Sequence, residues 1–252
     1  MRLAEASASS ACLSRTRSIV EGKYTPHPFA SDIERNKIGQ LLAEYLAMSA
    51  LFPYLQAGAQ WEAALAIIEQ GDEIPRSLEV TSVVGNFLTA DESGVNYVLS
   101  TWGIEGLPRI LETSNNFHSH LLRADIGMLL GEPIAPALTE RTQEYLKALA
   151  IDLSSTNTIR RVAAMVAFEN HAESMIEALW ETLSQMFDVD RDELTYFRVH
   201  VGGDDPAEQH HVRMTAEMID LLVDPEDIDI FVGHFEECYR LNFNWCRSLV
   251  RE

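Results

Sequence analysis

Long segments with helical periodicity dominate the sequence and restrict the fold more than any other feature. Apolar residues recur every three or four positions, and strand-type alternation persists nowhere. The 13 glycines and 9 prolines are sparse and fall between the periodic segments. These segments cover 31–52, 60–70, 77–94, 107–131, 139–153, 158–187, 206–223 and 226–250. The pattern predicts an all-α bundle of seven or eight helices without a domain boundary.

Composition limits the class of protein and its partners. The 252 residues are 46% hydrophobic, which suits one globular domain, expected here over 28–252. A formal net charge of −20 disfavours nucleic acid and anionic membrane as partners, and no apolar run is long enough to span a bilayer. Three cysteines without paired spacing indicate a reducing, cytoplasmic setting. Residues 1–27, rich in Ser and Arg at the start and without the apolar core of a secretory signal, are expected to form a loose, flexible arm.

Two carboxylates interrupt apolar helical faces. Glu169 lies on the stripe that includes Val166 and Ala172, and Glu92 lies on the stripe that includes Leu88. A buried carboxylate is costly unless it is paired or binds a metal ion. Each residue is therefore a candidate ligand, although either could instead lie at the edge of its stripe and reach solvent.

Two nearby histidines compete for one interior position. His120 shares a face with Phe117, Ala124 and Gly127, whereas His118 shares a face with Leu122 and other residues. Since the face of His120 is the more regular, His120 is the preferred candidate and His118 the alternative. His171 and Glu173 are interpreted as surface residues, and His27 and His234 remain unassigned.

The stretch "YFRVHVGGDDPAEQHHVRM", residues 196–214, gathers further ligand-type side chains around a break in the helix. On a continuous helix His200, Asp204 and His211 would share a face, while His210 would point away. Two glycines and a proline disfavour a continuous helix, and Pro206 suits the first turn of a new one. Glu208 and His211 have the i, i+3 spacing with which di-iron bundles present ligands. Either Asp204 or Glu208 is then the carboxylate ligand, with Asp204 preferred.

Together, four helices bring carboxylates and imidazoles to interior faces. Oxygen and nitrogen ligands without thiolates suit iron or manganese. The predicted ligand set is Glu92, His120, Glu169, His200, Asp204 and His211, with Glu208, His118 and His210 as alternatives.

The order of these residues resembles the haem-oxygenase-like di-iron oxidases and oxygenases. The matching elements are Glu in "DESG", His in "HLLRADIGMLLG", Glu in "AFE", then "YFRVHVGGDD" and a late His, over about residue 28 to the C-terminus. Members usually end in His-x-x-x-Asp-x-x-His, whereas position 207 here is Ala, which leaves His211 as the last histidine. Thiaminase II, the pyrroloquinoline-quinone synthesis protein and the chlamydial death-domain-associating protein share this fold.

The resemblance implies two Fe(II) ions, with manganese as the other candidate metal, and O₂ as co-substrate. It also implies a small organic substrate, an amino acid or another carboxylate, that undergoes N-oxygenation, desaturation, C–C cleavage or nitrile formation. Arg160, Arg161 and Arg198 are candidate cations for that carboxylate. The last helix of such a site is mobile in the resembled family, so residues 201–211 are expected to order when metal binds. A homodimer is the default expectation for the assembly.

Two other functions compete with this one. The first is a metal-free hydrolase like thiaminase II, which needs a catalytic cysteine in the core; Cys238 and Cys246 lie in the last helix. The second is an interaction protein without enzymatic activity on the same fold.

Overall fold

The computed structural model describes residues 7–204 and 207–251, without the side chains of 208, 209 and 212. The described chain is helical and contains no strand, so the prediction of an all-α bundle is confirmed. The α-helices are α1 (Ala8–Lys23), α2 (Ile38–Gly58), α3 (Trp61–Gln70), α4 (Arg76–Glu92), α5 (Val95–Trp102), α6 (Thr113–Asn116), α7 (His118–Leu130), α8 (Glu140–Leu153), α9 (Thr158–Phe187), α10 (Thr195–His200), α11 (Glu208–Leu222) and α12 (Ile228–Arg251). Short 3₁₀ helices are η1 (Pro28–Ala30), η2 (Ile104–Leu111), η3 (Arg191–Glu193) and η4 (Pro225–Asp227).

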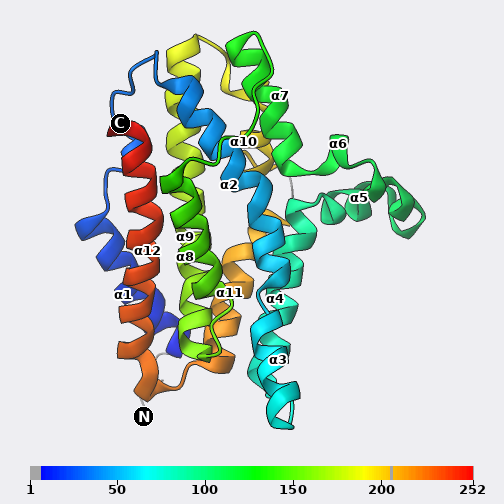
Figure 1. Ribbon diagram of the computed structural model, residues 1–252, viewed down its shortest axis with the longest axis vertical. Helices are drawn as coiled ribbons and strands as arrows, with labels where there is room; N and C mark the ends of the chain where they lie inside the picture. Colours follow the sequence, from blue (N-terminus) through cyan, green and yellow to red (C-terminus); the bar gives the residue numbers. More distant parts are fainter. Residues whose placement is uncertain (1–6, 205–206, 252) are drawn as a thin grey trace, which may run out of the picture.

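Helix α9 is the central element of the bundle. It packs against α12, α11, α8, α10 and α4, and α2 closes the same core from the side of α4, α7 and α8 (Figure 1). Small and apolar residues in its N-terminal part are completely buried, among them Val162, Ala163, Val166 and Ala167. Close packing of this kind fixes the rotation of α9 and therefore the direction of any polar side chain on it.

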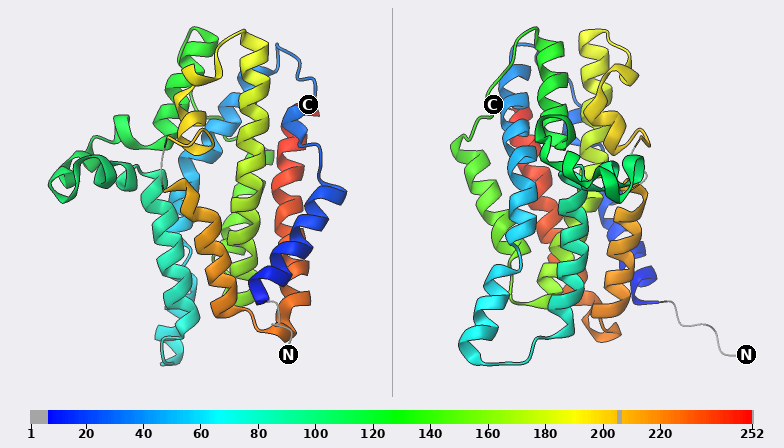
Figure 2. Two further views of the ribbon diagram at one scale, coloured as in Figure 1. Left: turned by 180° about the vertical axis from the view of Figure 1, so that it is seen from behind. Right: turned by 90° about the vertical axis from the view of Figure 1, so that its right-hand side faces the viewer.

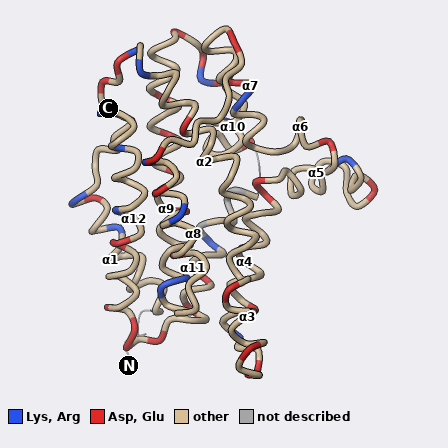
Figure 3. Tube along the Cα trace, in the orientation of Figure 1, with Lys and Arg blue, Asp and Glu red and all other residues tan. Residues whose placement is uncertain are grey.

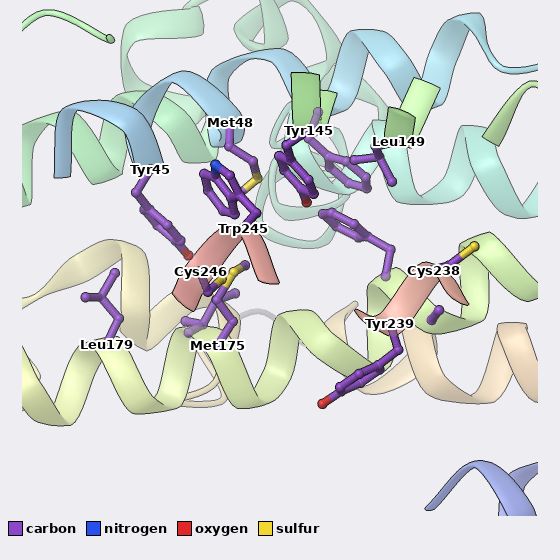
Figure 4. Packing of buried hydrophobic residues seen from close by; sticks show 14 of the residues in the cluster. Tyr45, Met48, Tyr145, Leu149, Met175, Leu179, Cys238, Tyr239, Trp245 and Cys246 are labelled. Atoms are coloured by element: carbon purple, nitrogen blue, oxygen red, sulfur yellow. The ribbon is translucent and has the colours of Figure 1, made fainter. Parts of the chain in front are cut away.

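The core beside α9 is rich in aromatic and sulfur-containing side chains. Figure 4 shows Met175 of α9 facing Cys246 of α12, with Met48 of α2 and Trp245 nearby. Tyr145 stacks on Trp245 with ring centroids 4.4 Å apart. Such large side chains remove much apolar area from water, which is the main stabilising term of the bundle.

The N-terminal range is not a loose arm, and that prediction is wrong for residues 8–23. Helix α1 lies along α12 and also packs on α11 (Figure 2). Ser9 donates from its backbone N–H and its hydroxyl to Asp220 at 2.8 and 2.7 Å, and Cys12 is fully buried. The serine-rich composition resembles a linker, but these serines and Cys12 supply caps and packing at helical spacing.

One excursion leaves the bundle. Helix α5, η2 and α6 project sideways between the end of α4 and the start of α7 (Figures 1 and 2). Acidic residues are distributed along most of the helices, in line with the net charge of −20 (Figure 3). Among the described residues, none of the helices has both the length and the apolarity that a membrane crossing requires.

An ion pair between Glu44 and Arg141 joins α2 and α8, and Arg141 also donates to the Ser248 carbonyl oxygen of α12 at 2.8 Å. Glu44 is completely buried and binds the Arg141 guanidinium with both oxygens, at 2.7 and 3.0 Å. Thr139, Thr142 and Gln40 also donate to Glu44. Burial opposes ionisation, but Arg141 and these donors together lower the pKa of Glu44 from 4.5 to about 2.

The Glu44 network predicts acid-sensitive stability. A carboxyl with a depressed pKa stabilises the fold above its unfolded pKa, and this contribution is lost as the pH falls from 4.5 toward about 2. Glu44→Gln should therefore lower the free energy of unfolding by about 3 kcal/mol at pH 6. The difference from wild type should shrink as the pH approaches 2. Urea denaturation between pH 6 and pH 3 measures it.

Glu177→Gln is the matched control, because Glu177 pairs with Arg191 at 2.7 Å on the half-exposed surface. It should cost at most about 1 kcal/mol. An equal cost for the two variants at pH 6 would contradict the assignment of a depressed pKa to Glu44.

Candidate metal centre

Two consecutive carboxylates form the first side of the site, where α4 ends. Asp91 is fully buried, and the side chain of Glu92 is 16% exposed. The helix stops here because Gly94 takes the left-handed conformation at φ +75°, which glycine adopts without a Cβ clash. A Cβ at this position would lie 2.4 Å from the Asn116 carbonyl oxygen, so Gly94 also allows α6 to approach the end of α4.

Helix α7 contributes His118 as its first residue. Phe117 is extended, and the helix begins directly after it, which places the buried imidazole of His118 against α4. His118 Nδ1 lies 3.6 Å from Glu92 Oε2 and 3.1 Å from His200 Nε2. His200 Nε2 lies 3.5 Å from Glu92 Oε1. Glu92, His118 and His200 thus form one compact group from three helices.

His200 is positioned by a buried carboxylate that caps its helix. Asp125 of α7 accepts hydrogen bonds from the backbone N–H groups of Thr195 and Tyr196, at 3.1 and 2.8 Å, and so fixes the start of α10. His200 Nδ1 then meets the Tyr196 carbonyl oxygen at 2.9 Å. Because a carbonyl only accepts, the proton lies on Nδ1 and the lone pair of Nε2 faces Glu92 and His118.

Helices α9 and α11 form the second group around Asp91. His211 Nε2 lies 2.9 Å from Asp91 Oδ2, and His211 Nδ1 lies 3.1 Å from Glu169 Oε2. The edge of Phe87 packs on the same imidazole, with ring centroids 5.6 Å apart. Since Asp91 and Glu92 are neighbours in sequence, the two groups adjoin.

A cavity of about 290 Å³ opens beside both groups. Glu92, Glu169, His200 and His211 form its polar end, and apolar side chains line the rest. The described residues around it are Met48, Ser49, Phe52, Glu92, Phe168, Glu169, Ala172, Glu173, Met175, Ile176, Tyr196, His200, Val201, Gly203 and His211. Phe52 and Phe168 stack 3.9 Å apart at its wall.

The electrostatics of the cluster favour ionised carboxyl groups at Asp91 and Glu92 and a neutral imidazole at His118. Burial, with a further contribution from His200, lowers the pKa of His118 from 6.5 to about 4. Burial raises the pKa of Glu92, but the neighbouring imidazoles of His200 and His118 outweigh it, and the net shift is downward. Asp91 behaves similarly through His211 and Asn96. Ionised carboxylate and neutral imidazole are the forms that bind a metal ion.

The donor geometry fits a metal ion. Ligand atoms at ~2.1 Å from one ion, with angles between 90° and 110°, lie roughly 3.0–3.4 Å from one another. The separations of 3.1, 3.5 and 3.6 Å among Glu92, His118 and His200 are close to that range. Oxygen and nitrogen donors without sulfur suit iron or manganese at this position.

The structure brings together four of the six predicted ligands. Glu92, Glu169, His200 and His211 all lie at the polar end of the cavity. Their role in metal binding remains a prediction.

The prediction that His120, and not His118, lies beside the carboxylates of the site is wrong. His118 is buried beside Glu92, whereas His120 is half-buried, with its ring 6.3 Å from that of Phe117. The face that contains Phe117, Ala124 and Gly127 is regular in sequence, but it is not the face that α7 turns toward α4. The first turn of the helix, with Phe117 as its cap, decides the direction instead.

Asp204, the preferred last carboxylate, is placed away from the cluster. Its side chain is exposed and forms an ion pair with Arg198 at 2.9 Å. Helix α10 ends at His200, so the shared face expected of a continuous helix does not exist. His210 is exposed, as expected. The side chain of Glu208 lies outside the described residues.

Sequence reasoning missed Asp91 as a member of the site. A signal existed, since Asp91 lies on the same helical stripe as Val84 and Leu88, and both are buried. Glu92, the next residue, was chosen from the same end of the helix, and Asp91 was not considered as a ligand. Both carboxylates belong to the site, because Glu92 lies beside His118 and His200 and Asp91 lies beside His211.

His171 is also not a surface residue as expected. It is buried, and its Nε2 lies 3.3 Å from Nε2 of His27, with Cys246 nearby. The Phe29 N–H donates to His27 Nδ1 at 3.1 Å, so the proton of His27 is on Nε2 and donates to His171. This hydrogen bond explains the pair without a metal ion.

Known proteins were compared with the chain at the levels of sequence and structure. No protein-family model and no curated protein matches the sequence. Two crystal structures of a CADD-like protein of unknown function from Nostoc punctiforme are similar in structure. One has a TM-score of 0.70 and 13% identity, covering 96% of this chain and 97% of that chain. The other has a TM-score of 0.61 and 14% identity, covering 96% and 94%.

The chain has the fold of CADD-like proteins. CADD is the chlamydial death-domain-associating protein, which has the haem-oxygenase-like fold. The expected fold is therefore confirmed, while identities this low show the fold alone.

The two histidines of α7 give a direct test of the site. His118→Ala should reduce iron retained after anaerobic Fe(II) loading and desalting, because it removes a donor of the Glu92 group. His120→Ala should retain wild-type iron, and both variants should keep native helical circular dichroism. Metal analysis of the desalted proteins measures the difference. Iron loss in His120→Ala with full loading in His118→Ala would reverse the placement.

Proposed function

We propose that the protein is a non-haem di-iron oxidase or oxygenase that uses O₂ to oxidise a small organic substrate. The observation that supports this most strongly is the pair of adjoining carboxylate–histidine groups at the end of one cavity. Glu92, His118 and His200 would hold one ferrous ion, and Glu169 and His211 the other. Bound there, two ferrous ions supply the electrons that reduce O₂ and the oxidising power that acts on the substrate.

The side chains around the cavity would bind the substrate and exclude water from it. Met48, Met175 and Ile176 supply an apolar wall, and the stacked Phe52 and Phe168 close one side of the cavity. An apolar wall keeps water from competing for the reacting atoms. The volume of about 290 Å³ suits a small substrate with an apolar body.

Charge favours a carboxylate substrate once metal is bound. Asp91, Glu92 and Glu169 are the carboxylates paired with histidines, whereas Glu173, which also borders the cavity, is exposed to solvent. Two ferrous ions would bring four positive charges against the three negative charges of the paired carboxylates, so the centre itself would attract an anion. The proposed substrate is therefore an amino acid or another small carboxylate.

The arginines expected to bind that carboxylate do not line the cavity. Arg160 pairs with Asp152 at 2.7 Å, and Arg198 pairs with Asp204. Arg161 is buried, and its Nη1 donates to the Ser155 carbonyl oxygen at 2.9 Å. No Lys or Arg is present in the described lining of the cavity.

A metal-free hydrolase is less consistent with this arrangement. Cys12, Cys238 and Cys246 are buried, and none of them is among the described residues that line the cavity. Burial raises the pKa of all three thiols, which disfavours the nucleophilic thiolate. A purely structural interaction protein would give no reason for three buried carboxylates paired with histidines.

Anaerobic titration with Fe(II), followed by exposure to O₂, tests the proposal. About two ferrous ions per chain should bind, and O₂ should then be consumed with a transient visible absorption band. Glu169→Ala should lose bound iron and O₂ consumption while its helical content stays native. Failure of the wild-type protein to bind ferrous iron would refute the proposal.

Glu173→Ala is the matched control for Glu169→Ala. Glu173 is an exposed carboxylate one turn further along α9 that lines the same cavity. It should retain iron and O₂ consumption. Equal losses in both variants would show a general effect of charge in the cavity instead of ligation by Glu169.

A further inference from the structure

Both ring nitrogens of His211 face carboxylates from different helices. Asp91 Oδ2 of α4 lies 2.9 Å from Nε2, and Glu169 Oε2 of α9 lies 3.1 Å from Nδ1. A histidine that binds a metal ion uses one nitrogen for the ion and donates the proton of the other to an acceptor. The two carboxylates near His211 must therefore have different roles when a metal ion is bound.

Their surroundings distinguish the two carboxylates. Glu169 lines the cavity, together with His211 itself. Asp91 is completely buried and is absent from the described lining, and its other oxygen, Oδ1, accepts a hydrogen bond from Asn96 Nδ2 at 2.9 Å. Open space for an ion and its substrate thus exists on the Glu169 side of the imidazole.

We propose that Asp91 is a positioning residue that holds the proton of His211 on Nε2 and presents Nδ1 to the metal ion on the Glu169 side. The proposal rests on the metal site of the proposed function. Asn96 assists, because its amide N–H fixes the rotation of the Asp91 carboxylate. Asp91 acts only through His211 and does not contact the ion.

His200 shows the same principle with the opposite nitrogen. Its Nδ1–H donates to the Tyr196 carbonyl oxygen at 2.9 Å, so Nε2 faces the Glu92 group. In His211 the acceptor lies on the other side of the ring, and Nδ1 is the nitrogen turned to the cavity. Each histidine is thus oriented by an acceptor outside the ligand group, a carbonyl for one and a carboxylate for the other.

Asp91→Asn changes this proton donor and acceptor pattern with little change in volume. Asn96 can donate only to the carbonyl oxygen of the amide that the substitution introduces, so the N–H₂ group of that amide turns toward His211 Nε2. The proton of His211 then moves to Nδ1, which no longer binds metal. Loss of such an orienting partner typically weakens metal binding about 10- to 100-fold.

The experiment compares metal binding and tautomer in wild type and Asp91→Asn. In anaerobic Fe(II) titrations, wild type should bind two ions, whereas Asp91→Asn should bind one normally and the second about 10- to 100-fold more weakly. In the zinc-loaded wild-type protein, ¹⁵N spectra of the histidines should show His211 with a protonated Nε2 and a metal-bound Nδ1. Asp220→Asn is the control, because Asp220 is a carboxylate of α11 that binds Ser9 far from the cavity. It should match wild type in both measurements.

The outcomes separate this proposal from the proposed function. If wild type and Asp91→Asn bind two ions with equal affinity, the role of Asp91 is refuted while the di-iron proposal stands. If zinc binds Nε2 of wild-type His211, the positioning role of Asp91 is also refuted, because Asp91 would then be a direct ligand. If wild type binds no metal ion, both proposals fail. Should Asp91→Asn not fold, the spectrum of the wild-type protein alone decides, and Asn96→Ala should show a smaller loss of affinity for the second ion.

Discussion

The burial of three carboxylates in one region of the bundle is the constraint on which the arrangement of the site depends. Asp91, Glu92 and Glu169 lie where water cannot solvate them well, and an unpaired buried carboxylate would destabilise the fold by several kcal/mol. Each has a histidine from another helix within 3.6 Å. These pairs connect α4, α7, α9, α10 and α11, so five helices must adopt one mutual register. The same pairs, apart from Asp91, supply the proposed metal ligands, because a buried carboxylate beside an imidazole presents oxygen and nitrogen donors to one point.

Long helices with a regular apolar face could be predicted from the sequence, and short elements could not. The apolar stripe on 158–187 correctly predicted α9 and the inward direction of Glu169. Over 30 residues, the spacing of the apolar residues defines which side of the helix faces the core. Helix α7 contains only 13 residues, and its phase depends on Phe117 and the approach of α6. Spacing alone therefore selected His120 instead of His118. The N-terminal helix was missed because its composition resembles a linker and its partners, on α11 and α12, are distant in sequence.

The break after His200 shows how a sequence signal can be recognised without its geometry. The glycines and proline indicated that the helix stops, but not where the chain goes next. The structure shows a turn in which Gly203 has φ +87° and Gly202 lies so close to Arg198 that a Cβ would approach its backbone to 2.7 Å. The Asp204 N–H donates to the Arg198 carbonyl oxygen, and the two side chains form an ion pair. Asp204 therefore helps to close the turn, and after the turn His211 lies beside Asp91 and Glu169 while His200 lies beside Glu92 and His118.

The excursion formed by α5, η2 and α6 leaves the bundle directly beside the candidate site. The excursion starts directly after Asp91 and Glu92 and ends directly before His118. Its two ends meet where Gly94 lies against Asn116, in a contact too close for any side chain at position 94. Asn96, in the first turn of α5, holds Asp91 in place. The separation between α4 and α7, and with it the distance from Glu92 to His118, is therefore set at the base of the excursion. A long excursion is compatible with a precise arrangement of Glu92 and His118 because its base is fixed by a backbone contact and a side-chain hydrogen bond.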